Sequence, residues 1–497
     1  MSARHAVIIG SGFGGLAAGV RLGARGWRVT VLERLEQPGG RARVHRQDGF
    51  TFDAGPTIIT APFLLDELWR LAGRRMEDDV ALRPLSPFYR LRFDDGSALD
   101  VSGDAVAMQA AVAQLAPGDA AGYARFMRLS ADLCAVGFEQ LGHVPFASAA
   151  DMLRVLPALL RRGAWRSVHG LAARHVRDPR LRVALSFHPL LIGGNPFTAS
   201  GIYGLIAHLE RHWGVWYAMG GTGTLVTGLC RLIEAQGGRI ALGAEVAAIE
   251  LAGRRATGVR LRSGQIVPAE IVVANGCTGF TYRNLVQPEA RRRWTDRRIA
   301  RARYSMGLFV WYFGTRGRYD DVPHHTILLG QRYRALLRDI FIRRHLGADF
   351  SLYLHRPTAT DPSVAPAGCD AFYALVPVPN LGGTVDWNAE AERFRAAVQQ
   401  RLEQTILPGL GGRIVTSRIS TPDDFARDFL SLHGAGFGMQ PLLTQSAWFR
   451  PHNRSEDVEN LFLVGAGTHP GAGLPGVLSS ARILDRLVPH DARVACH

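Results

Sequence analysis

The sequence predicts an α/β fold built around a parallel sheet, because three patterns follow one another in its first 33 residues. His5–Ile9 is a short apolar run with the length of a buried strand, and residues 10–15 form a glycine-rich turn directly after it. Residues 16–25 then show helical apolar periodicity. A second short strand, Arg28–Leu32, ends in an acidic residue, Glu33. This order is the fingerprint of a Rossmann-like dinucleotide-binding unit.

The glycines of this turn have separate physical roles. Gly10 permits the tight turn, while Gly12, in the same turn as Gly14, lets backbone N–H groups approach a pyrophosphate. Gly15 lets the helix and the strand pack closely, and the helix N-terminus adds partial positive charge. Glu33 follows where its carboxylate can accept hydrogen bonds from a ribose diol. Because an acid there disfavours a 2′-phosphate, the expected ligand is FAD or NAD.

The composition excludes several classes of protein. A chain of 497 residues with 47% apolar and 20% charged residues has room for two or three domains with a large core. All 58 basic residues are arginine, so a P-loop lysine and a Schiff-base lysine are excluded. A net charge of +15 is compatible with binding to nucleic acid, with binding to an anionic membrane surface, or with a role in solubility alone. The long apolar core and the lack of a basic tail favour the membrane, and no nucleic-acid partner is expected.

The cysteines indicate a reducing compartment. They are odd in number, widely spaced and without a CxxC pair: Cys134, Cys230, Cys277, Cys369 and Cys496. This disfavours a disulfide framework, a zinc site and a dithiol-flavin reductase. The apolar N-terminal run is the nucleotide-binding strand and helix, so no secretory signal is predicted. No uncharged apolar run reaches the roughly 18 to 20 residues of a spanning helix. We therefore expect a cytoplasmic protein without a metal site.

A second glycine-rich stretch carries arginines and follows Glu33 directly. Its glycines let the backbone lie against a cofactor, and arginine is suited to bidentate contact with phosphate oxygens. A plain NAD dehydrogenase would proceed to its next βα unit here, so the stretch indicates a flavoprotein whose extended FAD runs deep into the fold. The alternative is a surface loop with arginines for solubility. The residues expected to contact FAD here are Arg34, Gly40, Arg41, Gly55, Pro56 and Thr57.

The next segments predict a hairpin and a helical region. Residues 89–93 and 98–101 flank a turn, and the pattern is helical from 105 to about 182. Within it, residues 149–176 interleave arginines with apolar residues and Trp165, as in a helix that lies in a lipid headgroup layer. An ordinary helix with a solvated basic face is equally compatible. The arginine-rich run at 291–303 leaves the same two interpretations open.

The chain then returns to the predicted cofactor domain. A glycine turn caps a helix ending at 236, and strands follow at 239–250, 260–267 and 270–275. These strands are expected to complete one sheet and to bring Val246 and Asn275 to FAD. A second sheet region, with strands at 308–314, 351–354 and 372–377 and a helix at 390–405, is expected to hold a substrate chamber, since strands this apolar imply burial on both faces.

The C-terminal part predicts a second half-site on the first sheet. A strand from residue 460 runs into Gly465 and Gly467, and a helix follows Gly473, Pro475 and Gly476. The N-terminus of that helix could lie against the flavin, where its dipole would stabilise the anionic reduced ring.

These predictions divide the chain into three parts. Residues 1–85, 215–300 and 455–490 form the expected FAD-binding domain. Residues 86–104 and 301–454 form a mixed-sheet substrate-binding domain. Residues 105–214 form a helical lid that associates with the membrane.

Six motifs in this order resemble the bacterial-type phytoene desaturases nearly end to end. They are residues 10–15, 38–41, 49–57, 188–197, 445–453 and 465–476. The resemblance implies an FAD-dependent enzyme, peripherally bound to the membrane, that converts phytoene to more conjugated carotenes such as neurosporene or lycopene. One departure is visible: the family usually has Asn-Ala-Asp where this chain has Asn275-Gly276-Cys277, which puts any role for an acid there in doubt.

The resemblance also implies a mechanism and partners. A hydride passes to flavin and a proton is lost from the neighbouring carbon, and Asp151 and Arg154 match the acidic and basic pair proposed near the polyene. A surface pair is equally compatible, with a weak base or the reduced flavin taking the proton. The implied partners are phytoene, partly desaturated carotenes, membrane lipids, and oxygen or quinone as electron acceptor. The alternatives are a carotenoid isomerase or saturase and, disfavoured by the missing lysine, a flavin amine oxidase.

Overall fold

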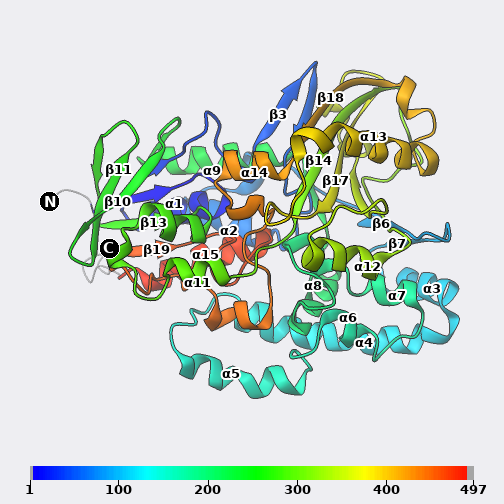
Figure 1. The fold of residues 1–497 in the computed structure, drawn as a ribbon, viewed down its shortest axis with the longest axis horizontal. Coiled ribbons are helices and arrows are strands. Elements are labelled where there is room, and N and C mark those ends of the chain that lie inside the picture. Colours follow the sequence, from blue (N-terminus) through cyan, green and yellow to red (C-terminus); the bar gives the residue numbers. More distant parts are fainter. Residues whose placement is uncertain (1–3, 490–497) are drawn as a thin grey trace.

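The computed structural model describes residues 4–489, and one of its centres is a five-stranded parallel sheet (Figure 1). The strand order is β19 (Leu461–Leu463), β13 (Ile271–Ala274), β1 (His5–Ile9), β2 (Arg28–Leu32) and β9 (Arg239–Ala241). All four neighbouring pairs are parallel. Segments from the start, the middle and the end of the chain therefore meet in one sheet, as the sequence predicts.

Helix α1 (Phe13–Ala24) is buried along most of its length beside this sheet. It packs against α2 (Phe63–Leu71), α9 (Thr222–Ala235) and α15 (Leu474–Leu487). A Cβ atom on Gly19 would lie 2.8 Å from Ile233 Cδ1, so a glycine is needed where α1 and α9 touch. The helix begins at Phe13, three residues before the predicted start at Leu16, because the extended Gly12 caps it directly.

The predicted continuous strand at 239–250 is wrong. The chain turns between β9 and β10 (Val246–Ala252), at Gly243, whose φ is +64°. The N–H groups of Gly243 and Ala244 donate to carbonyls of Leu35 and Glu33, which fixes this turn. As a result β10 leaves the parallel sheet and forms a separate antiparallel sheet with β11 (Arg255–Leu261) and β12 (Ile266–Pro268).

A seven-stranded mixed sheet makes up the second large layer of the fold. Its order is β18 (Ile414–Ser420), β14 (Gly307–Arg316), β17 (Cys369–Val378), β16 (Leu352–His355), β15 (His325–Leu328), β6 (Tyr89–Arg92) and β7 (Ala98–Val101). Only β15 and β6 pair in parallel. On β14, Phe309, Trp311 and Phe313 share a core with α13 (Trp387–Thr405), while Leu308 and Val310 belong to the core on the other side. This strand is therefore buried on both faces, as predicted.

The segment predicted to be helical is helical but interrupted. It contains α3 (Ala105–Leu115), α4 (Ala120–Cys134), α5 (Ala149–Arg161), α6 (Val168–Ala172), α7 (Pro179–Ala184) and, after them, α8 (Ile206–Trp213). Helix α5 lies at the lower edge in Figure 1 and has no buried residue. Within residues 4–489 no helix is both long enough and apolar enough to cross a membrane.

The remaining elements are short. Two ribbons pair β3 (Val44–Gln47) with β4 (Phe50–Asp53) and β5 (Leu82–Pro84) with β8 (Trp216–Ala218), and the further helices are α10 (Thr278–Phe280), α11 (Asp296–Arg301), α12 (Tyr333–Arg338) and α14 (Pro422–Phe429).

The arginine-rich run at 291–303 is tied to acidic residues of the protein. The Asp457 carboxylate accepts hydrogen bonds from the backbone N–H groups of Arg292, Arg293 and Trp294 at 2.7 to 3.0 Å. Arg291 pairs with Asp296 at 2.6 Å, and Arg293 pairs with Glu456. These contacts favour a structural interpretation of the run over lipid binding.

Candidate active site

The glycine turns at the two ends of the chain meet at Asn275. This residue follows β13, which lies between β1 and β19, and its Nδ2 donates to the Gly10 carbonyl at 3.3 Å. A Cβ atom on Gly14 would lie 2.8 Å from the backbone of Gly465. The predicted convergence of the two glycine turns is therefore confirmed by direct contact, and their joint binding of a cofactor stays a prediction.

Gly15 has a different position from the other glycines of the turn. A Cβ atom there would lie 2.1 Å from the Gly10 carbonyl oxygen, well inside van der Waals contact. Gly15 does not line the adjoining cavity. Its place fits the packing role predicted for it, since it lets α1 lie close against the turn.

Glu33 is buried at the end of β2, and Ser11 holds its carboxylate. The backbone N–H and the hydroxyl of Ser11 donate to Glu33 Oε2 at 2.9 and 2.7 Å, and the N–H of Leu35 donates to Oε1 at 3.0 Å. The sequence analysis missed Ser11, although its place between two glycines of the fingerprint was the available signal. The carboxylate is thus fixed at the edge of the cavity before any ribose binds.

A cavity of about 580 Å³ extends from these turns into the second domain layer. Every residue predicted to bind the cofactor, except Gly15, lines it: Gly10, Gly12, Gly14, Glu33, Arg34, Gly40, Arg41, Gly55, Pro56, Thr57, Val246, Asn275, Gly465, Gly467, Gly473, Pro475 and Gly476. The remaining wall is mainly apolar and includes Leu308, Val310, Tyr353, Tyr373 and Phe437. Met152 and Leu159 of α5 also line it, so the cavity reaches from the nucleotide turns to the helix at the molecular edge.

Arg41 provides a test of whether the cavity fits a dinucleotide. Its Nε atom is buried without a hydrogen-bond partner in the described structure, and no acidic residue of 4–489 forms an ion pair with it. Burial lowers the pKa of its guanidinium. A buried cation without a partner is costly, and phosphate oxygens are suited to pair with it. Arg41, the glycine cradle and the N-terminus of α1 therefore fit the pyrophosphate of FAD.

Arg34 and the N-terminus of α15 also lie at the cavity. The Arg34 guanidinium already donates to the carbonyls of Arg427 and Asp428 at 2.6 and 2.9 Å, so its contact with a cofactor stays a prediction. Helix α15 is capped by Gly473 at φ +94°, and Pro475 lies in its first turn. The predicted action of this helix dipole on the flavin ring fits that position.

Asp53 is a buried acid directly behind the cavity wall at residues 55–57. It accepts a hydrogen bond from the Thr222 N–H at 2.9 Å, and the Thr222 hydroxyl donates to the Pro56 carbonyl. Burial raises the pKa of Asp53 to about 6, against the opposing effect of hydrogen bonds from Thr222 and Gly223. Asp53 is thus a pH-sensitive support of the wall.

We expect Asp53→Asn to raise the free energy of unfolding at about pH 8 by on the order of 2 kcal/mol. The folded pKa, about 6, lies above the ordinary 3.8, so the folded state binds more protons and loses this stability as pH rises through that window. Asparagine keeps the acceptor for Thr222 without the charge. Urea unfolding at about pH 4 and about pH 8 measures the difference. The exposed Asp94→Asn is the control, and equal pH profiles for the two variants would contradict the prediction.

Asp151 and Arg154 lie together on α5, at 3.6 Å, but neither lines the cavity. The Asp151 carboxylate accepts from the N–H and the hydroxyl of Ser148, both at 2.9 Å, and so closes the capping box of the helix. These bonds lower the pKa of Asp151, and the Arg154 side chain is 77% exposed. The structure gives Asp151 a helix-capping role with Arg154 as its exposed ion-pair partner, and a catalytic role of the pair stays a prediction.

Comparisons with known proteins support a flavin cofactor. The family described as flavin containing amine oxidoreductase matches residues 13–483. The neurosporene-forming phytoene desaturase of Cereibacter sphaeroides is 50% identical, over 99% of this chain and 96% of that protein. The lycopene-forming phytoene desaturase of Pseudescherichia vulneris is 49% identical, over 98% and 99%. A solved putrescine oxidase variant has the same fold, with a TM-score of 0.67, 14% identity and 98% coverage of both chains.

Proposed function

The chain belongs to the flavin-containing amine oxidoreductases and, within them, to the phytoene desaturases, and on that premise we propose how its cavity works. The protein is an FAD-dependent oxidoreductase of carotenoid biosynthesis that converts phytoene to more conjugated carotenes such as neurosporene or lycopene. Its fold is the mixed α/β fold of flavin oxidoreductases.

One observation carries the proposed arrangement: the nucleotide turns and the apolar wall belong to a single cavity. Phytoene is an uncharged hydrocarbon, so its recognition depends on burial of apolar surface rather than on hydrogen bonds. Leu308, Val310 and Phe437 supply such a surface. The same wall excludes water from the reacting carbons, and Asn275 ties together the two turns against which the flavin would lie.

Different residues of the chain have different roles in the proposed reaction. FAD, when bound, supplies the hydride acceptor. Arg41 and the N-terminus of α1 would hold its pyrophosphate, and Glu33 would accept hydrogen bonds from its ribose. Asp151 remains the proposed proton acceptor, with Arg154 as its partner, although the pair would have to approach the substrate from the α5 end of the cavity. The terminal electron acceptor in this proposal is oxygen or a quinone.

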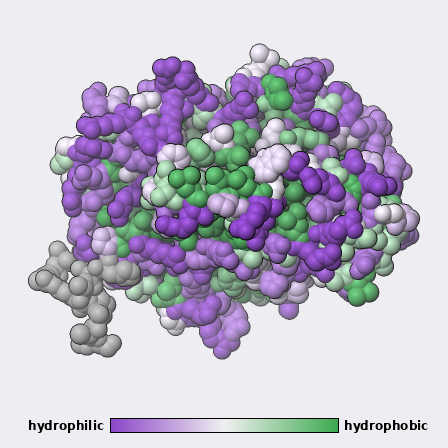
Figure 2. Space-filling view, turned by 90° about the horizontal axis from the view of Figure 1, so that it is seen from below, coloured by the Kyte–Doolittle hydropathy of each residue, from purple (hydrophilic) through white to green (hydrophobic). Residues whose placement is uncertain are grey.

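The face that carries α5 is proposed to bind the membrane surface from the cytoplasm. Figure 2 shows this face with a hydrophobic centre bordered by hydrophilic residues. The exposed apolar side chains there include Leu153 (66%), Leu160, Trp165 and, from segments near α5, Leu443 and Phe449. Exposed Arg154 and Arg161 flank them and suit anionic headgroups. Because Met152 and Leu159 line the cavity from the same helix, phytoene would enter it directly from lipid.

We also propose that the chain is divided into three functional parts. Residues 1–85, 215–300 and 455–490 would bind FAD, residues 86–104 and 301–454 would hold the substrate, and residues 105–214 would form the membrane-associating lid.

The test is reconstitution of the purified chain with FAD, phytoene and liposomes. We expect coloured carotenes of the neurosporene or lycopene type when oxygen or quinone is supplied, with pigments separated by chromatography.

Asp151→Asn should lower turnover by about 100-fold if the carboxylate takes the proton, since general base catalysis contributes about 10² to 10⁴. Loss of the helix cap alone costs only about 1 kcal/mol of stability.

Four results would contradict the proposal or one of its parts. FAD-loaded protein that leaves phytoene unchanged with both acceptors present would refute desaturation, and turnover only with reduced FAD under anaerobic conditions would indicate an isomerase or saturase. Oxidation of amines but not of carotenes would indicate an amine oxidase. Co-sedimentation with anionic liposomes that survives Leu153→Ser together with Trp165→Ser would refute the proposed membrane face.

A further inference from the structure

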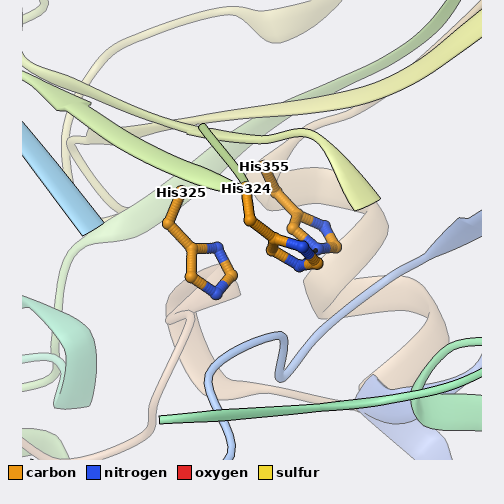
Figure 3. A group of neighbouring side chains, drawn as sticks. All are labelled: His324, His325 and His355. Atoms are coloured by element: carbon orange, nitrogen blue, oxygen red, sulfur yellow. Dashed lines mark hydrogen bonds between the residues drawn. The ribbon is translucent and has the colours of Figure 1, made fainter. Parts of the chain in front are cut away.

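Three histidines gather in the core of the protein, away from the glycine turns. His325 begins β15 and pairs in register with His355, which ends β16, while His324 directly precedes β15. Their side chains are 0%, 1% and 5% exposed, respectively. One ligand atom from each lies within 4.8 Å of the others. Figure 3 shows the three rings side by side below the strands that carry them.

Hydrogen bonds fix two of these rings through Nδ1. His324 Nδ1 lies 2.6 Å from the Thr360 hydroxyl, and His325 Nδ1 lies 2.8 Å from the Tyr353 hydroxyl. A metal-binding histidine characteristically has its second ring nitrogen held in this way, because the outer partner sets the tautomer and the ring orientation. With the outer nitrogens held, Nε2 of both rings faces into the cluster, toward the other histidine side chains or toward an ion.

The Nε2 atoms have few protein partners. His325 Nε2 is buried with no hydrogen-bond partner within residues 4–489. The Nε2 atoms of His324 and His355 face each other at 3.0 Å. In this contact one nitrogen donates its proton to the lone pair of the other. A cation could accept a lone pair from both. Tyr217 adds another buried hydroxyl without a partner in the described part of the chain, and its ring lies 4.7 Å from that of His324.

The cluster offers nitrogen ligands rather than carboxylates. No carboxylate of residues 4–489 forms an ion pair with any of the three.

We propose that His324, His325 and His355 bind one divalent metal ion of the zinc class, with Tyr217 or water as the fourth ligand. Three imidazole nitrogens suit zinc, and zinc–nitrogen bonds of about 2.0 to 2.1 Å in a tetrahedral site place ligand nitrogens about 3.3 Å apart. The Nε2 atoms of His324 and His355, at 3.0 Å, already have nearly this separation. The ligand atoms lie within 4.8 Å of one another, so the third ring has to close in by up to about 1.5 Å to complete the site.

The position of the site indicates a structural role behind the substrate cavity. The Tyr353 hydroxyl joins His325 to the Thr57 hydroxyl, at 2.8 and 2.7 Å, and both Tyr353 and Thr57 line the cavity. A bound ion would cross-link β15 and β16 and would fix the wall to which Tyr353 belongs. This site is independent of the proposed desaturation, so either can fail without the other.

The test is the metal content of the purified chain, produced without a polyhistidine tag and dialysed with zinc and then without it. We expect about one zinc per chain by elemental analysis, and visible absorption bands of tetrahedral cobalt after exchange with Co²⁺. His355→Gln and His324→Gln should each lower retained zinc by about 10-fold or more. His45→Gln, which changes a half-buried histidine outside the cluster, should retain it.

The proposal is overturned by wild-type protein that retains no zinc and gives no cobalt spectrum, a result that needs no variant to fold. It is equally overturned if the His324 and His355 variants keep as much metal as His45→Gln does, because the ion would then lie elsewhere. The FAD absorbance of each variant, measured beside its circular dichroism, shows that the fold is retained. Added zinc should also raise the thermal midpoint of the wild type but not that of His355→Gln.

Discussion

Replacing Gly15 with alanine should weaken FAD binding strongly. The new Cβ atom would lie 2.1 Å from the Gly10 carbonyl oxygen, and this backbone cannot yield without moving the turn that faces the cavity. Displacing the turn removes both the close approach of Gly12 to the pyrophosphate and the alignment of α1 behind it. We expect the affinity for FAD to fall by at least about 100-fold, which corresponds to about 3 kcal/mol. Titration of apoprotein with FAD, followed by flavin fluorescence, measures the loss.

Gly118→Ala is the matched control, because no atom lies within 4 Å of a Cβ atom built there. The control should bind FAD as the wild type does. If Gly15→Ala protein binds FAD with unchanged affinity, then the close packing of α1 on the turn is not what the cofactor site depends on.

Replacing Arg356 with methionine should destabilise the fold by about 3 to 5 kcal/mol, the cost of breaking a buried ion pair. The Arg356 side chain is 2% exposed, and its Nε donates to Asp370 at 3.0 Å. Asp370 is fully buried and also accepts from the Thr358 hydroxyl at 2.6 Å. Methionine preserves much of the volume but leaves the carboxylate of Asp370 buried without its cation. Urea unfolding of the FAD-loaded protein measures the change.

Two further variants separate charge from packing. Arg393→Met removes the exposed partner of Glu390 and should cost no more than about 0.5 kcal/mol. The double variant Arg356→Met with Asp370→Asn should recover a large part of the stability, because no unpaired charge remains. If the double variant is as unstable as Arg356→Met, lost packing rather than the unpaired carboxylate causes the effect.

The cofactor half of the molecule could be predicted from the sequence because its chemistry is encoded in short segments. A glycine turn, the strand before it and the helix after it depend on neighbouring residues, so the positions of Gly10 to Glu33 followed from local rules. The same holds for the turn at Gly465 and the helix after Pro475. The convergence of these two segments could also be predicted from the sequence. The turns after parallel strands lie at the same edge of the sheet, which is where such folds bind their ligands.

Contacts between distant residues were decided only by the tertiary structure. Asp151 was predicted from a motif, yet its carboxylate caps α5 outside the cavity. The turn at Gly243 breaks a stretch that looks like one strand, because carbonyls of residues 33 and 35 accept its N–H groups.

The histidine cluster is the clearest example of a feature that only the tertiary structure decides. His324, His325 and His355 have no spacing typical of metal ligands, and the sequence analysis predicted no metal site. Pairing of β15 with β16 places them together and removes them from water. Local sequence therefore determined the turns and helices that can hold a dinucleotide. The packing of the whole chain decided which polar side chains became buried neighbours, because burial depends on residues far away along the chain.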